Sequence, residues 1–362
     1  MGLKAWATTN DTVWSTSNGT IVTSLVDADN PEGIRPYTIR FKFDDGTYNP
    51  TNETGWIFGS IWVQVSSSPN VWDFTYTNHD WRFAFQRLFQ DRNNLVHIVG
   101  ANLIGVYDVK GTFIECSALR SIGLMDLSTV TTADGLFYRC SAINSVTGLN
   151  TSSLTDATGM FQECASLSSV PLFDTSNVTK MTSMFGGCTS LSSVPLFDTS
   201  RATDMRSMFI NCPSLTTVPL FDTSEVTSMD SIFAGCSSLN SVPLLNTSKS
   251  TSMTYMFDGC ISLTTVPLFN TARVTNMRGM FKSCKSMTAI PLYNTVNTTN
   301  VSEMFYGCNN VETGSLALYQ QMSSQVLVPE YHDNCFSGCG RDTVTGSAEL
   351  AQIPASWGGT AS

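Results

Sequence analysis

Charged side chains and histidines are scarce in this sequence. Asp, Glu, Lys and Arg make up 13% of the 362 residues, about half the usual share, and there are only three histidines, His79, His97 and His332. No G-x-S-x-G, P-loop or H-E-x-x-H motif occurs. The sequence therefore predicts a protein that is not an enzyme and has no cofactor.

Long apolar runs and basic stripes are lacking as well. No apolar run approaches the roughly 18 residues of a membrane span, and the segment from Met1 to Asp11 lacks the apolar core of a signal peptide. A net charge of −10 argues against a grip on nucleic acid, which needs a basic stripe. We expect a protein that folds in the cytoplasm, binds no nucleic acid and does not insert into a membrane.

Cysteine is plentiful, and its spacing is periodic. Nine of the 11 cysteines lie 24 residues apart, and each follows a Phe by three residues. These cysteines are Cys116, Cys140, Cys164, Cys188, Cys212, Cys236, Cys260, Cys284 and Cys308. Their Phe partners include Phe185, Phe209 and Phe233, and the Phe series begins one period earlier, at Phe89. A period of about 20–29 residues is typical of leucine-rich-type repeats, so the sequence predicts a solenoid in which Phe and Cys form a structural ladder.

Each 24-residue coil is predicted to contain a short strand, a turn and a short helix. In the coil that starts at Cys164, Leu167, Val170 and Leu172 have the spacing of a leucine-rich strand, and alternation places Val170 and Leu172 on one inward face. A proline removes a backbone donor, so its recurrence predicts a very short or irregular ladder at Pro171, Pro195, Pro219, Pro243, Pro267 and Pro291.

The second half of the coil has helical spacing. Asp174-Thr175-Ser176 favours a turn. The apolar residues that follow are spaced by three and four, as on one face of a helix, and Gly187 suits the helix end because it tolerates a positive φ. These apolar residues are Val178, Met181, Met184, Phe185 and Cys188.

The array extends beyond the cysteines, and the predicted fold class is an α/β solenoid with two caps. Val71, Phe74 and Tyr76 fill strand positions of the coil, and Phe336-x-x-Cys339 restores the motif after a seven-residue surplus. We predict a small N-terminal β cap or docking domain at 1–70, a solenoid at 71–345 with an inserted short helix at about 314–328, and a C-terminal helical cap at 346–362.

The two caps have their own signals. Residues 38–43 alternate in polarity, and Asp45-Gly46 then predicts a hairpin turn. A solenoid exposes apolar core at an open end. We therefore expect Leu350, Ile353 and Trp357 to plug the last coil.

Two groups of residues can be interpreted either as metal sites or as structural features. The ladder Asp174, Asp198, Asp222, Asn246, Asn270 and Asn294 supplies one carboxylate or amide per coil, too few for the six to eight oxygens of calcium, so a hydrogen-bonded turn ladder is favoured. His332, Cys335 and Cys339 invite zinc, but a closed site needs four ligands. The cysteine ladder is interpreted as buried thiols rather than disulfides, because stacked Cβ vectors run parallel. No metal is predicted.

Two kinds of position are candidates for an interaction surface. An aromatic position recurs at Phe173, Phe197, Phe221, Phe269 and Tyr293. Packing inside the coil is favoured for it, and an outward aromatic ridge is the alternative. Variable positions carry charges of both signs at Arg201, Glu225, Lys249, Arg273, Arg206 and Arg278. A solvated helical edge is favoured for them over a binding site.

The repeat resembles that of the BspA-like leucine-rich-repeat surface proteins. The unit F-D-T-S-x-V-T-x-M-x-x-M-F-x-G-C-x-S-L is nearly unbroken over Phe173 to Leu191 and over Phe221 to Leu239. The resemblance covers about residues 71–345 and implies adhesion or host contact without catalytic residues. Members of that family occur on bacterial cell surfaces and in phage virions. The C-terminal A-E-L-A-Q-I-P-A-S-W-G-G looks like that of phage-encoded relatives.

These observations favour a virion structural protein displayed on a phage tail or head. Its expected partners are other virion proteins, a polysaccharide or protein of the host cell surface, and further copies of itself, since virion appendages are commonly symmetric. The alternative is an adhesin at the bacterial cell surface. The sequence favours the virion because the surface-type repeat is combined with no recognised export signal.

Overall fold

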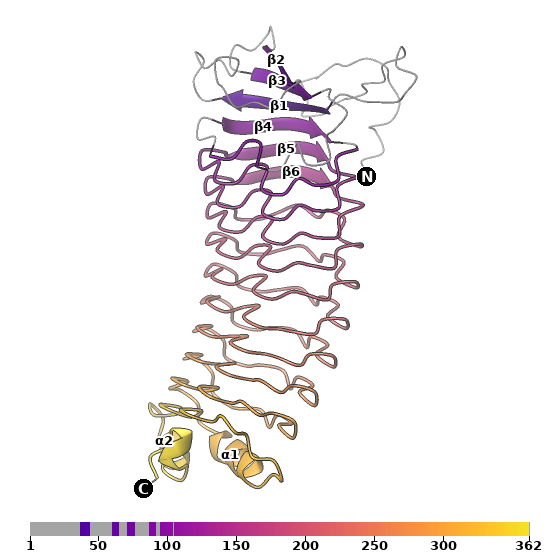
Figure 1. The fold of residues 1–362 in the computed structure, drawn as a ribbon. Coiled ribbons are helices and arrows are strands. Elements are labelled where there is room, and N and C mark those ends of the chain that lie inside the picture. The colour runs from indigo at the N-terminus through magenta and orange to yellow at the C-terminus, as the bar shows by residue number, and fades with distance from the viewer. Residues whose placement is uncertain are drawn as a thin grey trace.

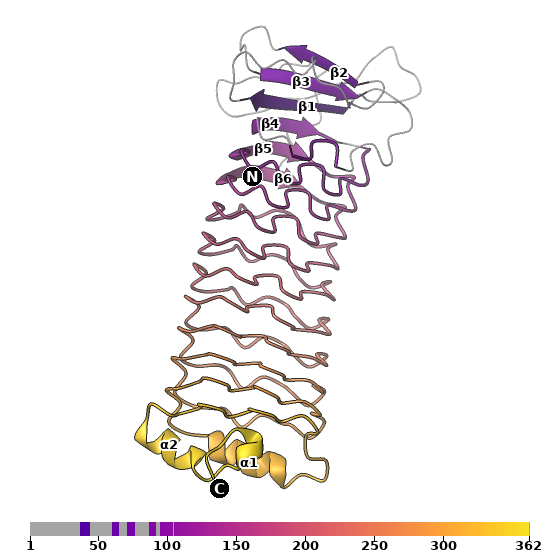
Figure 2. The same ribbon diagram turned by 60° about the vertical axis from the view of Figure 1, so that its left-hand side comes forward.

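The computed structural model describes residues 37–43, 60–64, 71–76, 87–91, 95–103 and 105–361. Over these residues the chain is a repeat solenoid, with coils stacked into one elongated column (Figure 1). The six strands lie at one end of the column and the two α-helices at the other, and a turned view shows the same order (Figure 2).

The strands form one sheet in the order β2-β3-β1-β4-β5-β6. β4 (Leu95–Asn102), β5 (Ser121–Asp126) and β6 (Ser145–Asn150) are parallel and belong to successive coils. β1 (Tyr37–Phe43) pairs antiparallel with β4 and with β3 (Val71–Tyr76), and β3 pairs antiparallel with β2 (Ser60–Gln64). Antiparallel strands therefore cover the edge that the first parallel strand would otherwise leave open.

This sheet crosses the predicted boundary at residue 70. The strand expected at 38–43 is confirmed as β1, but its partners are β3 and β4, and Asp45-Gly46 lies outside the described residues. Val71 and Phe74 lie in a strand, as expected, but β1 separates that strand from β4. Parallel stacking therefore starts with β4.

In the described residues after Asn150, the regular strand ladder is absent, as the prolines predict. From Pro171 onward one backbone donor is missing from this segment of each coil. Several of the remaining bonds between neighbouring coils here are long, such as 3.3 Å from the Thr216 amide to Ser192 O and 3.4 Å from the Thr264 amide to Asn240 O.

The predicted helix in each coil is wrong. The segment from Met181 to Cys188 is a series of tight turns whose backbone amides alternate between two kinds of acceptor. The amides of Met184, Gly186 and Cys188 donate to the carbonyl three residues earlier in their own coil. The intervening amides donate to carbonyls of the next coil, as in the 2.9 Å bond from Ser183 N to Arg206 O.

Left-handed residues explain why this segment cannot be helical. Ser183 and Gly187 have φ of 52° and 75°, and the same two positions have positive φ in the neighbouring coils, for example at Ser207 and Asn211. A right-handed helix does not accommodate a left-handed residue every four residues. The three-and-four apolar spacing is kept because consecutive turns also return every third or fourth side chain to the interior. Gly187 does adopt a positive φ, but within the turn series.

The core is a set of ladders along the column axis. Phenylalanine rings from Phe89 to Phe336 stack in series, with centroids 5.5 Å apart between Phe113 and Phe137 and 6.0 Å apart between Phe209 and Phe233. The cysteines of the series are fully buried, and each Sγ donates to a carbonyl 27 residues earlier, such as Cys188 Sγ to Phe161 O at 3.1 Å. The predicted Phe–Cys structural ladder is confirmed.

The C-terminal end is closed by short helices. α1 (Ser315–Ser323) lies within the predicted insertion, and α2 (Val344–Leu350) precedes the 3₁₀ turn η3 (Ala355–Trp357). Leu350, Ile353 and Trp357 are buried, which confirms the predicted plug. The Glu349 carboxylate joins the helices, since it accepts hydrogen bonds from the Ser315 hydroxyl and the Leu316 amide.

Candidate interaction surface

The recurring Pro-Leu-Phe tripeptide reverses the expected side-chain directions. The amide of Phe197 donates to Pro195 O at 3.0 Å, two residues back, which closes a γ-turn. Phe221, Phe269 and Tyr293 make the same bond. A γ-turn breaks strand alternation, so the aromatic residue turns inward and the leucine between it and the proline turns out.

The aromatic position is therefore core and not surface. Packing inside the coil, the favoured interpretation, is confirmed, and the alternative of an aromatic ridge is wrong, because the exposed fraction is at most 5% at Phe173, Phe197, Phe221, Phe269 and Tyr293. The predicted inward direction of Leu172 is also wrong, since Leu172 is 66% exposed whereas Val170 is 8% exposed.

The outward leucines form the most extensive exposed apolar feature of the described coils. We call them the leucine ridge: Leu172, Leu196, Leu220, Leu244, Leu268 and Leu292. Each is 55–66% exposed, and they occupy the same position of six consecutive coils. Coils about 4.8 Å apart make this ridge roughly 24 Å long. Contiguous apolar surface of this kind marks contact sites, whereas scattered leucines do not.

A column of Asp and Asn runs beside the ridge and fixes its turns. The side-chain oxygen of each accepts the amide two residues on, as in the 3.0 Å bond from Ser200 N to Asp198 and the 3.1 Å bond from Ser248 N to Asn246. The turn-ladder interpretation is thus confirmed. Hydrogen bonds from Ser200 lower the pKa of Asp198, so this exposed carboxylate stays charged at mildly acidic pH.

The buried threonine that follows each Asp or Asn links one coil to the next. Thr175 Oγ1 donates to Asp198 O at 2.8 Å, and Thr199 Oγ1 makes the same 2.8 Å bond to Asp222 O. These bonds hold the Asp/Asn column, and with it the adjacent ridge, at the spacing of the coils.

The ridge begins beside a shallow recess of about 340 Å³. Gly148 occupies the ridge position one coil before Leu172 and supplies no side chain there. The recess is lined on that side by Leu149 and Asn150, and on the other by Leu172, Leu196 and Asp198.

The predicted charged positions lie on turns rather than on a helical edge. Arg201, Glu225, Lys249 and Arg273 lie three residues after the Asp or Asn and are all exposed. Arg201 donates to Asn177 Oδ1 at 2.9 Å, and Lys249 lies 2.6 Å from Glu225. This column therefore borders the ridge on the side of the Asp/Asn column.

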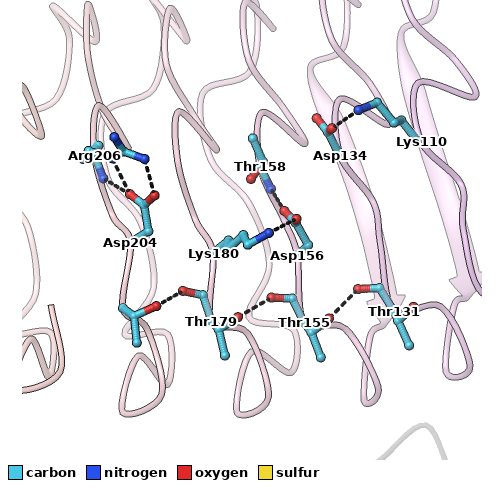
Figure 3. Close-up of polar contacts among 11 residues, drawn as sticks. Lys110, Thr131, Asp134, Thr155, Asp156, Thr158, Thr179, Lys180, Asp204 and Arg206 are labelled. Atoms are coloured by element: carbon cyan, nitrogen blue, oxygen red, sulfur yellow. Dashed lines mark hydrogen bonds and ion pairs between the residues drawn. The ribbon is translucent and has the colours of Figure 1, made fainter. Parts of the chain in front are cut away.

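Arg206 and Arg278 belong to a different edge of the coil. Arg206 forms a bidentate pair with Asp204, while a row of threonine hydroxyls runs along the same edge (Figure 3). Thr155 Oγ1 donates to Thr131 O at 3.0 Å, and Thr179 Oγ1 to Thr155 O at 3.2 Å. The structure thus separates two sets of charges that the sequence suggests share one face.

The residues of the suggested zinc motif have other surroundings. Cys335 and Cys339 are buried, whereas the half-buried His332 ring stacks on Trp357 with centroids 4.2 Å apart. Burial raises the pKa of Cys335 and Cys339 above the ordinary thiol value, which keeps them protonated. Within the described ranges no three His, Cys, Asp or Glu side chains are placed to hold a metal ion.

The sequence contained a signal for the leucine ridge. Leucine follows proline in six successive coils, and strict alternation past proline assigned it to the interior. The γ-turn that overrides alternation could have been suspected because proline fixes its own φ and removes a ladder donor.

Fold and surface together define a repeat-solenoid protein with an exposed apolar ridge. The family model described as "Mycoplasma protein of unknown function, DUF285" matches residues 107–220 and 214–317. The chain belongs to this family.

Solved structures with some similarity include a leucine-rich cell surface protein from Faecalibacterium prausnitzii A2-165 and a leucine-rich repeat protein from Eubacterium ventriosum ATCC 27560. Both are 16% identical to this chain, with TM-scores of 0.26 and 0.29. The matches cover 65% of this chain and 81% of the first protein, and 60% of this chain and 84% of the second. No curated protein matches the chain.

Proposed function

We propose that this chain is a non-catalytic binding protein of a bacterial cell surface, and that the leucine ridge is its contact surface. The observation that carries the proposal is the exposure of six leucines at one position of six consecutive coils. Exposing this much apolar surface in register is unfavourable for an isolated soluble column. Contact with a partner removes it from water.

The bacterial location replaces the virion that the sequence favours. The matching family is described from Mycoplasma, which is a bacterium, and this agrees with the adhesin alternative. The virion interpretation gains no support from the comparisons. Among the described residues no helix is long and apolar enough to cross a membrane.

The location is tested on intact cells of the organism that encodes the chain. Antibody labelling of unpermeabilised cells, and loss of the protein after brief protease treatment of those cells, are the expected results. Recovery of the chain from purified phage particles, with no labelling of bacteria, would replace the proposal with the virion interpretation.

The contact surface is tested with purified protein. The variant L196S/L220S/L244S removes three central ridge leucines that contribute little to the core. We expect it to lose most of the binding of the wild-type protein to bacterial or host cells. The control is I261S, because Ile261 is 43% exposed but lies off the ridge. Equal loss in both variants would contradict a role specific to the ridge.

A further inference from the structure

The charges beside the leucine ridge divide it into an acidic and a basic half. In its first three coils, the two flanking columns carry Asp174, Asp198, Asp222 and Glu225 against one cation, Arg201, for a net charge of −3. In its last three coils, the same columns carry Lys249 and Arg273 with Asn246, Asn270 and Asn294, for a net charge of +2. The flanking Asp, Asn, Arg and Lys side chains of these coils are exposed, apart from the half-buried Asn177.

We propose that the leucine ridge pairs with the same ridge of a second copy of this chain, with the two solenoids antiparallel. This rests on the proposed function, since it names the partner of that surface. A two-fold interface requires a surface complementary to itself after rotation. A rotation about the centre of the ridge, between Leu220 and Leu244, brings the acidic half of each copy against the basic half of the other.

The opposite charges meet mainly at the centre of the ridge. The coil of Leu196 faces that of Leu268, so Arg273 lies opposite a coil that carries Arg201 as well as Asp198. The coil of Leu220 faces that of Leu244, which brings Asp222 and Glu225 opposite Lys249. A parallel pair would instead hold the two acidic halves at the same height. Electrostatic complementarity of this kind selects orientation and register.

Equal pitch makes a second copy the best-fitting partner. Both columns repeat every 24 residues, so leucines that meet in one coil meet in all six. Figures 1 and 2 show the coils from the strands to the helices stacked without a break. A partner with another spacing would lose register along a ridge of roughly 24 Å.

The antiparallel pairing also brings the two ends of the ridge opposite each other. Continuing the register by one coil sets the coil of Gly148 in one copy, beside the 340 Å³ recess, opposite the end of the other copy that carries α1. Gln321 in α1 holds this helix against the last ridge coil, because its Nε2 donates to Tyr293 O at 2.7 Å. A recess in one copy thus faces an inserted helix in the other.

Sedimentation equilibrium of the purified chain tests the pairing. We expect a concentration-dependent dimer, with a dissociation constant raised more than about tenfold in L220S/L244S and unchanged in I261S. A wild-type chain that stays monomeric at every concentration would overturn the inference, as would equal dimerisation by L220S/L244S.

Charge variants test the direction. K249E/R273E makes both halves acidic and should weaken the dimer by more than about tenfold. Adding D174N/D198N/D222N/E225K exchanges the two halves and should restore it, since Asn caps the same turn in other coils. Restoration is expected only if opposite halves face each other. A swapped variant that stays monomeric, although folded by circular dichroism, would overturn the antiparallel arrangement.

Cross-linking gives an independent readout. In an equimolar mixture of L172C and L292C, an antiparallel dimer yields the mixed disulfide, while a parallel one yields each variant linked to itself. The native thiols are buried and should not compete. If the chain is monomeric but L196S/L220S/L244S still abolishes binding to cells, this inference fails and the proposed function stands. If the ridge variants change neither property, both fail.

Discussion

Leu220 and Phe221 are adjacent in the chain, but one is 62% exposed and the other 2% exposed. The bond from the Phe221 amide to Pro219 O creates this difference within two residues. Phe221 stacks on Phe209 with centroids 6.1 Å apart, so it continues the interior ladder. The two residues therefore contribute to different properties, Leu220 to the surface and Phe221 to stability.

Substitution of each residue by alanine should separate these roles. Phe221→Ala leaves a cavity and should lower the free energy of unfolding by about 3–5 kcal/mol. Leu220→Ala should change it by no more than about 0.5 kcal/mol at concentrations where the chain is monomeric. Denaturant titration followed by circular dichroism measures both values. Similar losses in the two variants would show that the leucine is packed.

Glu303 is the residue whose titration should affect stability in acid. The ammonium of Lys282 and the guanidinium of Arg278 donate to its carboxylate and hold its pKa below the ordinary value of 4.5. A depressed pKa means that the folded state favours the charged form, so this stabilisation is present above about pH 4.5 and is lost as the pH falls through the folded pKa.

Glu303→Gln should therefore make the melting temperature less dependent on pH below 4.5 while lowering it at pH 7. Thermal melts of both proteins between pH 3 and pH 7 provide the measurement. An unchanged acid dependence in the variant would assign the effect to other carboxylates.

The turn series is the element that distinguishes this solenoid from the predicted strand–turn–helix coil. Its left-handed positions accept Ser, Asn, Glu, Arg and Tyr as well as Gly. Non-glycine residues there carry a conformational cost of roughly 1–2 kcal/mol each. Hydrogen bonds from alternate amides to the next coil compensate for it, so the element is stable only in a stack.

Two glycines of this series should respond differently to an added methyl group. Gly135 and Gly279 have φ of +60° and +58°, but a Cβ at Gly135 meets nothing closer than Tyr138 Cβ at 3.6 Å, while one at Gly279 would collide with the Tyr255 ring. Gly135→Ala should cost about 1–2 kcal/mol from conformation alone. Gly279→Ala should cost about 1–3 kcal/mol more because of overpacking. Equal costs, measured by denaturant titration, would mean that Tyr255 moves away freely.

On the scale of the whole molecule, the part of the chain that the structure describes has one continuous core along the column. Phenylalanine rings, thiols and threonine hydroxyls each form a line along the axis, and every coil contacts only its neighbours. Burial raises the pKa of Cys212, Cys260 and Cys308 to about 12. Because the thiolate is the reactive form, these cysteines should react only when the coils unfold.

Thiol labelling should follow unfolding of the column. The native protein at pH 8 should react with almost none of an aromatic disulfide reagent, and all 11 cysteines should react in guanidinium chloride. The control is the same titration after pre-incubation with reductant. Rapid labelling of the native protein, or fewer than 11 thiols without reductant, would contradict a column of buried thiols.

From the sequence we could predict the repeat, its 24-residue register, the Phe–Cys ladder, the loss of regular strands after the prolines, and the plug of Leu350, Ile353 and Trp357. These follow from periodicity and burial, which a linear pattern records directly. The conformation of the second half of each coil was decided only by tertiary structure, because apolar residues spaced by three and four fit both a helix and consecutive turns. Hydrogen bonds to the neighbouring coil choose the turns.

The interaction surface, too, could be predicted from the sequence only in part. The sequence identified the recurrent proline and aromatic positions, and it assigned the variable positions with charges of both signs to one helical edge. Only the folded chain showed which neighbour faces water, because a γ-turn shifts the inward position by one residue. It also separated Arg201 and Arg273, beside the ridge, from Arg206 and Arg278 on another edge. That separation depends on how 24 residues close into a coil, and a repeat period does not contain this information.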